Sequence, residues 1–390
     1  MDPLHRLRRD VPLSEEERIL LESVRQVAKD VIAPNASHYD DTGEFPWKNI
    51  RAMNDLGLNG VFIPAEFGGA GLSHHGYLAC LLEISSACAA TGIIWATNFH
   101  SMKPVVAFGN QDQKERFLPR IASGGLGSLV ISEAQAGSDA TGMTTSFRED
   151  GDDILINGSK IFITNGDVAD VFLVFGKWYG IDDPRRAISA VVVEKGTPGL
   201  RALGLEKKMG HRASSTAALS FDNCRVPRAN LLRNPGDGLQ ILFASLNRSR
   251  PSVAAHALGI AHAAFRKTIA YIADRRAFGR RIGDNQGVQF MIADLAAELL
   301  VVEGLLWRVA DLLEQDVEDL SLESSILKLK ATDLAMKAAE TAVQLHGGFG
   351  YCVDGGVERL MRDAKITQIW EGANELHRQL IGGKFVRSVI

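Results

Sequence analysis

Eight apolar residues in the last third of the chain recur at alternating steps of four and three. They are Val288, Ile292, Leu295, Leu299, Val302, Leu306, Val309 and Leu313. A 3.5-residue repeat sustained over nearly four heptads is typical of a long helix that packs lengthwise against other helices. A second pattern, over residues 322–345, repeats at Leu327, Ala331, Leu334, Ala338 and Leu345. The sequence therefore predicts a four-helix bundle in this part of the chain.

The first 120 or so residues also have a helical pattern. Ser14 and Glu17 have the spacing of a capping box, and apolar residues on one helical face follow until Pro34, where we expect the helix to stop. Further helices are expected at residues 47–56, 76–90, 93–108 and 111–121. Thr91-Gly92 and Gly109-Asn110 are the expected breaks between the last three.

At about Gly127 the apolar pattern changes to short runs separated by turn residues. Strands are expected at residues 128–132, 154–156, 159–164, 171–175, 188–194 and 216–222. Asn157-Gly158 suits a type I′ turn, which predicts a hairpin between the second and third of these strands. The fold class is therefore α+β multidomain. We expect an N-terminal α-helical domain (1–127), a small middle β-barrel or β-sandwich domain (128–235) and a C-terminal four-helix-bundle domain (236–390).

Composition excludes several classes of protein. The 390 residues carry a net charge of −4, which does not suggest a nucleic-acid-binding protein. The four cysteines are scattered without a CxxC pair, which favours a reducing compartment and no structural zinc site. The most apolar stretch, residues 77–99, contains Glu83 and several small polar residues, so we expect buried helices there and no membrane span. Phosphate-loop, HExxH and GxSxG motifs are absent, and no metal site is expected.

Three stretches could bind a ligand. The loop at residues 131–139 follows a strand and could hold a flat polar ring or a phosphate with its amides and hydroxyls, or be a plain surface loop. Residues 275–281 place four arginines around Phe278, a cluster that could grip an anion, form a solvated basic corner or contact nucleic acid. The acidic net charge argues against the last of these. Residues 344–351 end a long helix with three closely spaced glycines, which indicates close approach of another group to the backbone.

A fourth stretch could supply a catalytic base. Residues 366–370 are rich in apolar side chains, and Glu371 and Gly372 follow directly. An apolar environment penalises the charged form of a carboxylate, and a glycine lets a ligand approach the backbone. Glu371 could therefore remove a proton from carbon, although a solvated or helix-capping carboxylate is the more common meaning of such a pattern.

Taken together and in this order, these stretches resemble the FAD-dependent acyl-CoA dehydrogenases, closest to short-chain or branched-chain members. The resemblance covers essentially the whole chain and extends to both family signatures. The first is Ser132-Glu133-x-x-Ala136-Gly137-Ser138-Asp139, with Val130 where a smaller residue is usual. The second is Gln344-x-x-Gly347-Gly348-x-Gly350-Tyr351-x-x-Asp354-x4-Arg359-x3-Asp363, matched without exception.

The resemblance implies an FAD site shared between two subunits. The residues implied to line the flavin ring and ribityl chain are Leu129, Ile131, Ser132, Gly137, Ser138, Phe162 and Thr164, with Ala373 and Glu375 close to the cofactor. The residues implied to reach the ADP half from a neighbouring subunit are Arg275, Phe278, Gln286, Gln344, Gly347 and Gly348. A homotetramer built as a dimer of dimers is therefore expected. Electron-transfer flavoprotein is the expected electron acceptor.

For the substrate, the resemblance implies an acyl-CoA thioester. The implied contacts are Ser138, Asn247, Arg248, Arg250 and Gly372, and Trp95 either plugs the acyl pocket, favouring short or branched chains, or is an ordinary core tryptophan. The family places its catalytic base at one of two positions, which here hold Glu371 and Ser249. Residues 238–273 contain no Asp or Glu, so Glu371 has no competitor.

The resulting expectation is α,β-dehydrogenation of an acyl-CoA to the trans-2-enoyl-CoA, with Glu371 taking the α-proton and a hydride passing to the flavin. Two departures bear on the flavin: Phe162 stands where many members have Trp, and Ala373 replaces a common hydroxyl residue. A flavin monooxygenase or oxidase on the same fold is the alternative, and a non-catalytic flavin or acyl-CoA binding protein is a third. We expect a cytoplasmic protein in a bacterium, or a mitochondrial matrix protein in a eukaryote.

Overall fold

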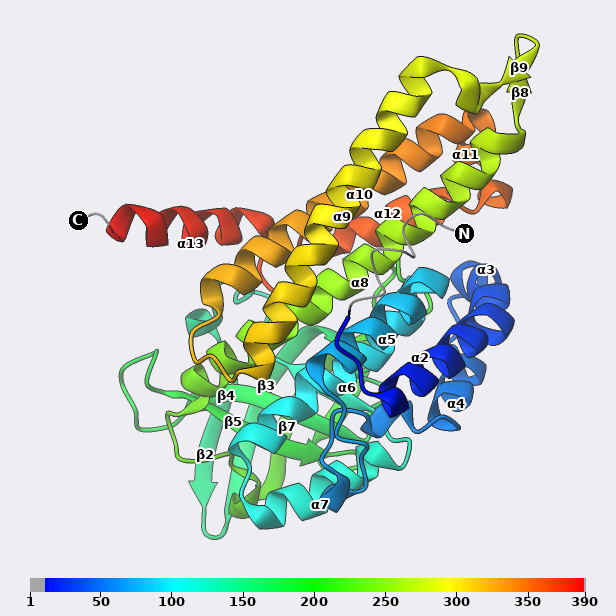
Figure 1. Ribbon diagram of the computed structural model, residues 1–390. Helices are drawn as coiled ribbons and strands as arrows, with labels where there is room; N and C mark the ends of the chain where they lie inside the picture. Colours follow the sequence, from blue (N-terminus) through cyan, green and yellow to red (C-terminus); the bar gives the residue numbers. More distant parts are fainter. Residues whose placement is uncertain (1–10, 389–390) are drawn as a thin grey trace.

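The computed structural model describes residues 11–388 and divides into three parts along the chain. Figure 1 shows the N-terminal helices in blue and cyan, a β-sheet in green, and long C-terminal helices that cross the molecule and extend beyond the other two parts. The order α, then β, then α confirms the predicted fold class. None of the helices in the described range is both long and apolar enough to cross a membrane.

From residue 11 onward, the N-terminal part contains six α-helices. Their bounds are α2 Glu15–Val27, α3 Ala33–Thr42, α4 Trp47–Asn54, α5 His74–Ala87, α6 Ala89–Phe108 and α7 Gln111–Ala122, with short 3₁₀ turns at Leu58–Gly60 and Ala65–Phe67. The predicted capping box is confirmed, because the Glu17 amide donates to Ser14 Oγ (3.1 Å) and the Ser14 amide donates to Glu17 Oε2 (2.9 Å).

Two predicted helix breaks were wrong. Pro34 does not stop the first helix: a π-helical turn, η1 Ala28–Ile32, leads directly into α3, where Pro34 is the second residue and its missing N–H matters little. Thr91-Gly92 lies inside α6, and the break comes at Cys88 instead. A Cβ on Gly92 would lie 2.2 Å from Ser85 Oγ, so this glycine allows close packing of α6 and α5.

The middle part is one seven-stranded sheet in the order β1-β4-β2-β3-β7-β6, with β5 paired to β4. The bounds are β1 Gly127–Val130, β2 Ser146–Asp150, β3 Asp153–Thr164, β4 Val171–Trp178, β5 Ile188–Glu194, β6 Leu200–Leu205 and β7 Thr216–Pro227. Phe172 and Val174 of β4 face a core made mostly of sheet residues, as in a barrel-like sheet, whereas Leu173 and Phe175 face the helices. β4 is therefore buried on both faces.

The predicted hairpin at Asn157-Gly158 was wrong. These residues lie within β3, where the register with β7 shifts between Ile156 and Gly158. A Cβ on Gly158 would come within 2.7 Å of the Thr145 Cα, so the glycine is needed for close approach of the chain. The turn that joins β2 and β3 instead contains Gly151, whose φ is +64°.

The C-terminal part contains the long helices. The bounds are α8 Gly238–Asp274, α9 Gln286–Glu314, α10 Ser321–His346, α11 Gly348–Tyr351, α12 Glu358–Thr367 and α13 Asn374–Arg387, with a small hairpin of β8 Arg276–Ala277 and β9 Arg280–Arg281. The predicted heptad stripe lies on α9. Its members from Leu295 to Leu313 are buried, but Val288 and Ile292 are only half-buried because this end of α9 extends past the bundle.

Candidate active site

Glu371 lies in a short loop between α12 and α13. Glu371 and Gly372 both have left-handed backbone, with φ of +52° and +92°. A Cβ on Gly372 would lie 3.0 Å from the His377 ring, so only glycine fits here without displacing a neighbour. This double left-handed turn presents the Glu371 side chain to α8.

Two neighbours on α8 surround the Glu371 carboxylate. Ser249 Oγ donates to Glu371 Oε2 at 2.6 Å. Arg250 follows and is only 6% exposed; burial lowers its pKa, and the charge of Glu371 opposes that change. The Arg250 guanidinium donates to Asn247 Oδ1 (3.3 Å) and to Ser325 Oγ (3.4 Å). The structure thus brings together Glu371, Asn247 and Arg250, which the sequence had proposed as site residues.

Two residues that the sequence did not single out hold the loop. Lys328 on α10 is fully buried and donates to the Gly372 carbonyl (2.7 Å) and to Asn374 Oδ1 (2.9 Å). Burial lowers the pKa of Lys328 to about 8, against the opposing effect of the Glu371 charge. His377 Nε2 donates to the Glu371 carbonyl at 3.2 Å. For Lys328, the signal in the sequence was its position directly after Leu327, a residue of the apolar stripe of α10.

A second group of predicted residues gathers where the loop after β1 meets β3. The amide of Ile161 donates to the Ser132 carbonyl (2.9 Å), and Ser128 Oγ donates to the Thr164 carbonyl (2.7 Å). Leu129 on β1 and the loop residues Ile131 and Ser132 are half-buried, whereas Gly137 and Ser138 are exposed. These hydrogen bonds place β1 and the start of the loop next to β3, and this region is called the surface beside β3.

A buried ion pair fixes that surface. Lys160 Nζ lies 2.9 Å from Glu133 Oε1 and also donates to the Ile131 carbonyl at 2.7 Å. Burial would raise the pKa of Glu133, but hydrogen bonds from Lys160 and Thr145 lower it to about 2. Burial lowers the pKa of Lys160 to about 8 although Glu133 opposes this. Both groups are charged at neutral pH, and together they tie the loop to β3.

Phe162 is unusual on this surface. Its φ is +58°, it lies at a second register shift of β3, and its ring is 62% exposed. A left-handed phenylalanine in a strand is a rare conformation, and an exposed aromatic ring gains free energy when a flat apolar partner covers it. The geometry fits a ring ligand lying against β3.

A third group lines an open cleft of about 1280 Å³ at the outer end of α8 and α10. Arg275, Gln344, Gly347 and Gly348 all border it, beside the stacked rings of Tyr271 and His346, whose centroids are 4.2 Å apart. Phe278 is fully exposed at the tip of the β8–β9 hairpin, and Gln286 is exposed at the start of α9.

The third group is far from the other two within one chain. Ser249, beside the base, and Asp274, beside the cleft, are separated by 25 positions of one continuous helix, or about 38 Å at the usual rise. Figure 1 accordingly shows the β8–β9 hairpin and the sheet at opposite ends of the molecule. A single cofactor could contact both groups only if the third group came from a second copy of the chain.

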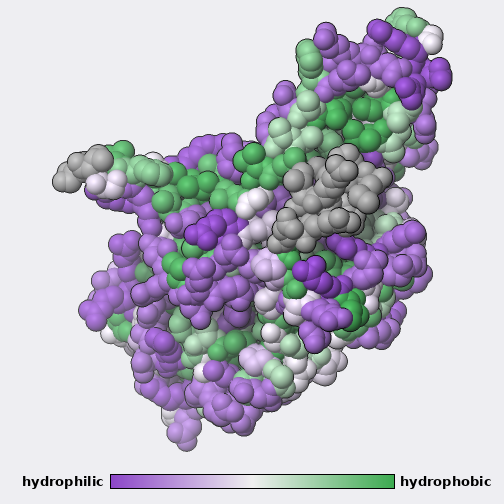
Figure 2. All heavy atoms as spheres, in the orientation of Figure 1, coloured by the Kyte–Doolittle hydropathy of each residue, from purple (hydrophilic) through white to green (hydrophobic). Residues whose placement is uncertain are grey.

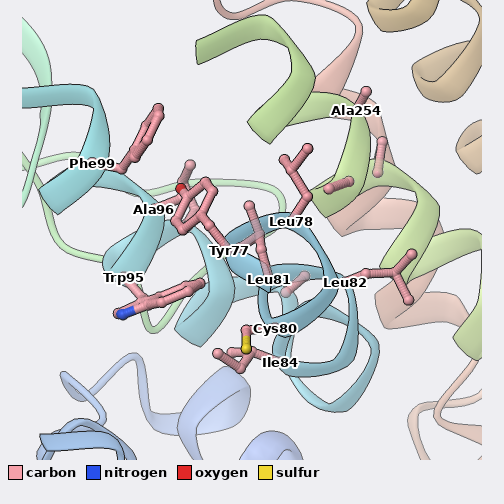
Figure 3. Close-up of a cluster of buried hydrophobic side chains, with 14 of the residues drawn as sticks. Tyr77, Leu78, Cys80, Leu81, Leu82, Ile84, Trp95, Ala96, Phe99 and Ala254 are labelled. Carbon is pink, nitrogen blue, oxygen red and sulfur yellow. The ribbon is translucent and has the colours of Figure 1, made fainter. Parts of the chain in front are cut away.

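The four remaining predicted residues lie in the core, on α8 and around the start of α13. Trp95 is buried in the core: its ring lies 5.1 Å from that of Tyr77 and its Nε1 donates to the Leu58 carbonyl at 2.9 Å (Figure 3). The Arg248 guanidinium lies 3.9 Å from Asp316. Ala373 is the residue before α13, and Glu375 is exposed in the first turn of that helix. Among residues 11–388 no group of three His, Cys, Asp or Glu side chains is placed to hold a metal ion.

Comparison with known proteins decides the family. The chain matches the acyl-CoA dehydrogenase N-terminal domain at residues 14–125, the middle domain at 128–224 and the C-terminal domain at 236–385. The chain belongs to the acyl-CoA dehydrogenase family. Members of this family are oxidoreductases that act on the CH–CH group of an acyl-CoA, and the family is FAD-dependent in general.

Individual acyl-CoA dehydrogenases resemble the chain over nearly its full length. An acyl-CoA dehydrogenase of Bacillus subtilis is 42% identical, with 95% of this chain and 97% of that protein covered. The mouse mitochondrial short-chain specific acyl-CoA dehydrogenase is 38% identical, covering 99% and 93%. The solved butyryl-CoA dehydrogenase of Megasphaera elsdenii superimposes with a TM-score of 0.93 at 33% identity, covering 97% and 100%.

Proposed function

We propose that this chain oxidises a short or branched acyl-CoA to the trans-2-enoyl-CoA, with Glu371 as the base that takes the α-proton. The observation that carries the assignment is the position of Glu371: a left-handed loop presents its carboxylate to a stretch of α8, residues 238–273, that contains no Asp or Glu. No second carboxylate on that stretch competes for the role.

The surface beside β3 and the outer cleft fit an FAD molecule shared between two copies of the chain. Leu129, Ser132, Gly137, Ser138, Phe162 and Thr164 would hold the ring end, and Arg275, Phe278, Gln286, Gln344, Gly347 and Gly348 of a second copy would hold the ADP end. When bound, FAD supplies a hydride acceptor for the β-hydrogen. A dimer is the smallest unit with a complete site, and we propose a dimer of dimers.

The chain itself supplies the proton chemistry. An α-proton beside a thioester is weakly acidic, so the enolate oxygen needs hydrogen-bond donors, each worth about 2.7–4 kcal/mol to the transition state. The left-handed turn frees the Glu371 amide for this role, and the carboxylate of the same residue takes the proton. Ser249 and the Lys328 anchor hold the carboxylate and the loop in place.

We also propose the substrate contacts, the electron acceptor and the location. Asn247, Arg248, Arg250, Ser138 and Gly372 would bind the thioester and CoA, and buried Trp95 would limit the length of the acyl chain. Electron-transfer flavoprotein is the proposed acceptor. We also propose a cytoplasmic location in a bacterium and a matrix location in a eukaryote.

Glu371→Gln tests the proposal. The variant holoenzyme should keep its bound flavin. Its anaerobic rate of flavin reduction by butyryl-CoA should fall at least about 1000-fold, because the amide cannot accept the proton. Glu66→Gln, which changes an exposed carboxylate in the short 3₁₀ turn Ala65–Phe67, should leave the rate of flavin reduction at the wild-type value. A normal rate in Glu371→Gln would overturn the assignment, and rapid reoxidation of the reduced wild-type enzyme by air would favour an oxidase.

A further inference from the structure

Three buried polar groups meet one helical turn beyond Ser249, in the space between α5, α6 and α8. Ser252 Oγ on α8 lies 3.0 Å from the Tyr77 hydroxyl and 2.9 Å from His100 Nε2. All three residues are at least 95% buried. Figure 3 shows Tyr77 between Phe99 and Trp95, in an otherwise apolar cluster. A polar cluster in such a place needs all its hydrogen bonds satisfied.

The hydrogen bonds of this cluster leave one ring atom unused. If Ser252 donates to His100 Nε2, the neutral imidazole carries its proton on Nδ1; if Nε2 donates to Ser252, then Nδ1 is an acceptor. In either tautomer, His100 Nδ1 has no partner among the described residues. Nδ1 is not fully enclosed by other atoms of the described range, so it borders accessible space.

The cluster is close to the base. Ser249 and Ser252 are three residues apart on α8 and so share one face of the helix, and Ser249 bonds to Glu371. The charge of Glu371 also acts on His100, whose pKa is lowered by burial despite this opposing effect. His100 is therefore an uncharged hydrogen-bonding group that lies one helical turn of α8 away from the serine that holds the base.

We propose that His100, positioned by Ser252 and Tyr77, binds an uncharged polar group, a hydroxyl, on the acyl chain beyond the β-carbon. This inference rests on the proposed dehydrogenation of an acyl-CoA. A pure hydrocarbon chain would bury Nδ1 without forming a hydrogen bond to it. A binding site whose polar atom is left without a hydrogen bond rejects such a ligand strongly. A carboxylate would lose its hydration in this buried cluster, where the neutral His100 offers it at most one hydrogen bond. The substrate class is therefore a short hydroxyacyl-CoA.

The test compares two substrates that differ only in a terminal group. In 4-hydroxybutyryl-CoA a hydroxyl replaces the terminal methyl of pentanoyl-CoA, so chain length is matched. We expect wild-type kcat/KM to favour 4-hydroxybutyryl-CoA by about tenfold or more. His100→Leu should reverse that preference, and His100→Asn, which retains a donor and an acceptor, should restore part of it. His38→Leu, on the surface of α3, is the control that should leave the ratio unchanged.

Binding of the two products gives a readout without turnover. Wild-type holoenzyme should bind 4-hydroxy-2-butenoyl-CoA about tenfold more tightly than 2-pentenoyl-CoA, and His100→Leu should lose this difference. Two results would overturn the inference and leave the dehydrogenase proposal intact. One is a wild-type preference for pentanoyl-CoA and 2-pentenoyl-CoA. The other is a His100→Leu variant that loses kcat/KM and affinity equally for the hydroxylated and the hydrocarbon compounds. If neither substrate nor butyryl-CoA is oxidised, the proposed function fails instead. Flavin content confirms that each variant has folded.

Discussion

At the scale of single residues, the least favourable feature of the site is the left-handed backbone conformation of Glu371. A left-handed conformation costs a side-chain-bearing residue about 1–3 kcal/mol and persists only where neighbours enforce it. Here Lys328 and His377 hold the two carbonyls of the turn, at Gly372 and Glu371. The strain is therefore balanced by contacts from α10 and α13, and these contacts fix where the carboxylate points.

Ser249 is predicted to be a positioning residue for the base. Its hydroxyl donates to Glu371 Oε2 at 2.6 Å, and a hydrogen bond to a charged group contributes about 1.5–3 kcal/mol. We expect Ser249→Ala to lower kcat by about tenfold with little change in KM, because the carboxylate gains alternative rotamers. Stopped-flow flavin reduction by butyryl-CoA measures the change. Ser249→Thr should recover most of the rate, and an unchanged kcat in Ser249→Ala would contradict the role.

The sequence could propose Glu371 as the base but could not show what supports it. A carboxylate followed by glycine, shortly after the second family signature, is visible in the order of residues. Lys328 and His100 come from helices far away in the chain, and each would pass for a residue on an ordinary helical face. Their roles depend on which helices pack against α8 and α13, and that information exists only in the tertiary structure.

At the scale of elements, the ion pair between Lys160 and Glu133 makes the loop after β1 sensitive to acid. Because the pKa of Glu133 is depressed to about 2 in the folded protein, its contribution is complete above about pH 4.5 and is lost as the pH falls toward 2. The size of the contribution is on the order of 3 kcal/mol. We expect Glu133→Gln to melt several degrees below wild type at pH 6, with the difference reduced to about a quarter at pH 2.5.

Differential scanning fluorimetry across this pH range checks the prediction. Glu149→Gln removes a carboxylate from an exposed ion pair with Arg228 and should shift the melting temperature little at any pH. A difference between Glu133→Gln and wild type that stays constant from pH 6 to pH 2.5 would show that the charge of Glu133 is not what stabilises the loop.

Elements with strong periodicity were predicted well, and those set by packing were not. The long helices α9 and α10 follow from their apolar repeats. β2 and β6 were missed because β2 is largely polar and β6 is almost wholly exposed, so neither shows the alternation of a half-buried strand. The turn signal at Asn157-Gly158 failed because the glycine serves close approach to Thr145 inside a strand. Local signals cannot distinguish a bulge from a turn.

At the scale of the whole molecule, the single chain leaves apolar side chains uncovered. On α9, Phe290 and Val301 are exposed, the latter to 72%, and Phe385 and Val386 are exposed on α13. Figure 2 shows green, apolar residues along α13 and over the outer part of the C-terminal helices. The cleft bordered by Arg275 and Gln344 lies on α8, β8 and α10, in the same C-terminal part of the chain. Association of chains through this part would cover apolar surface and complete the proposed flavin site together.

Mixing two inactive variants tests that shared site. Each site takes its ring end, with Glu371, from one chain and its ADP end, with Arg275, from the other chain. Arg275→Glu should therefore abolish flavin binding in the partner's site. Glu371→Gln should abolish proton removal in the site of the chain that carries it. In a mixed dimer, the chain with intact Glu371 receives intact Arg275 from the other chain, so one of two sites is whole. Random pairing should therefore restore about a quarter of wild-type activity. Co-expression with two affinity tags isolates the mixed dimer, which should have about half of the wild-type activity. Activity that stays at the level of the two parent variants would mean that each chain builds its flavin site alone. The distance of about 38 Å along α8 between Ser249, beside the base, and Asp274, beside the cleft, would then need a different explanation.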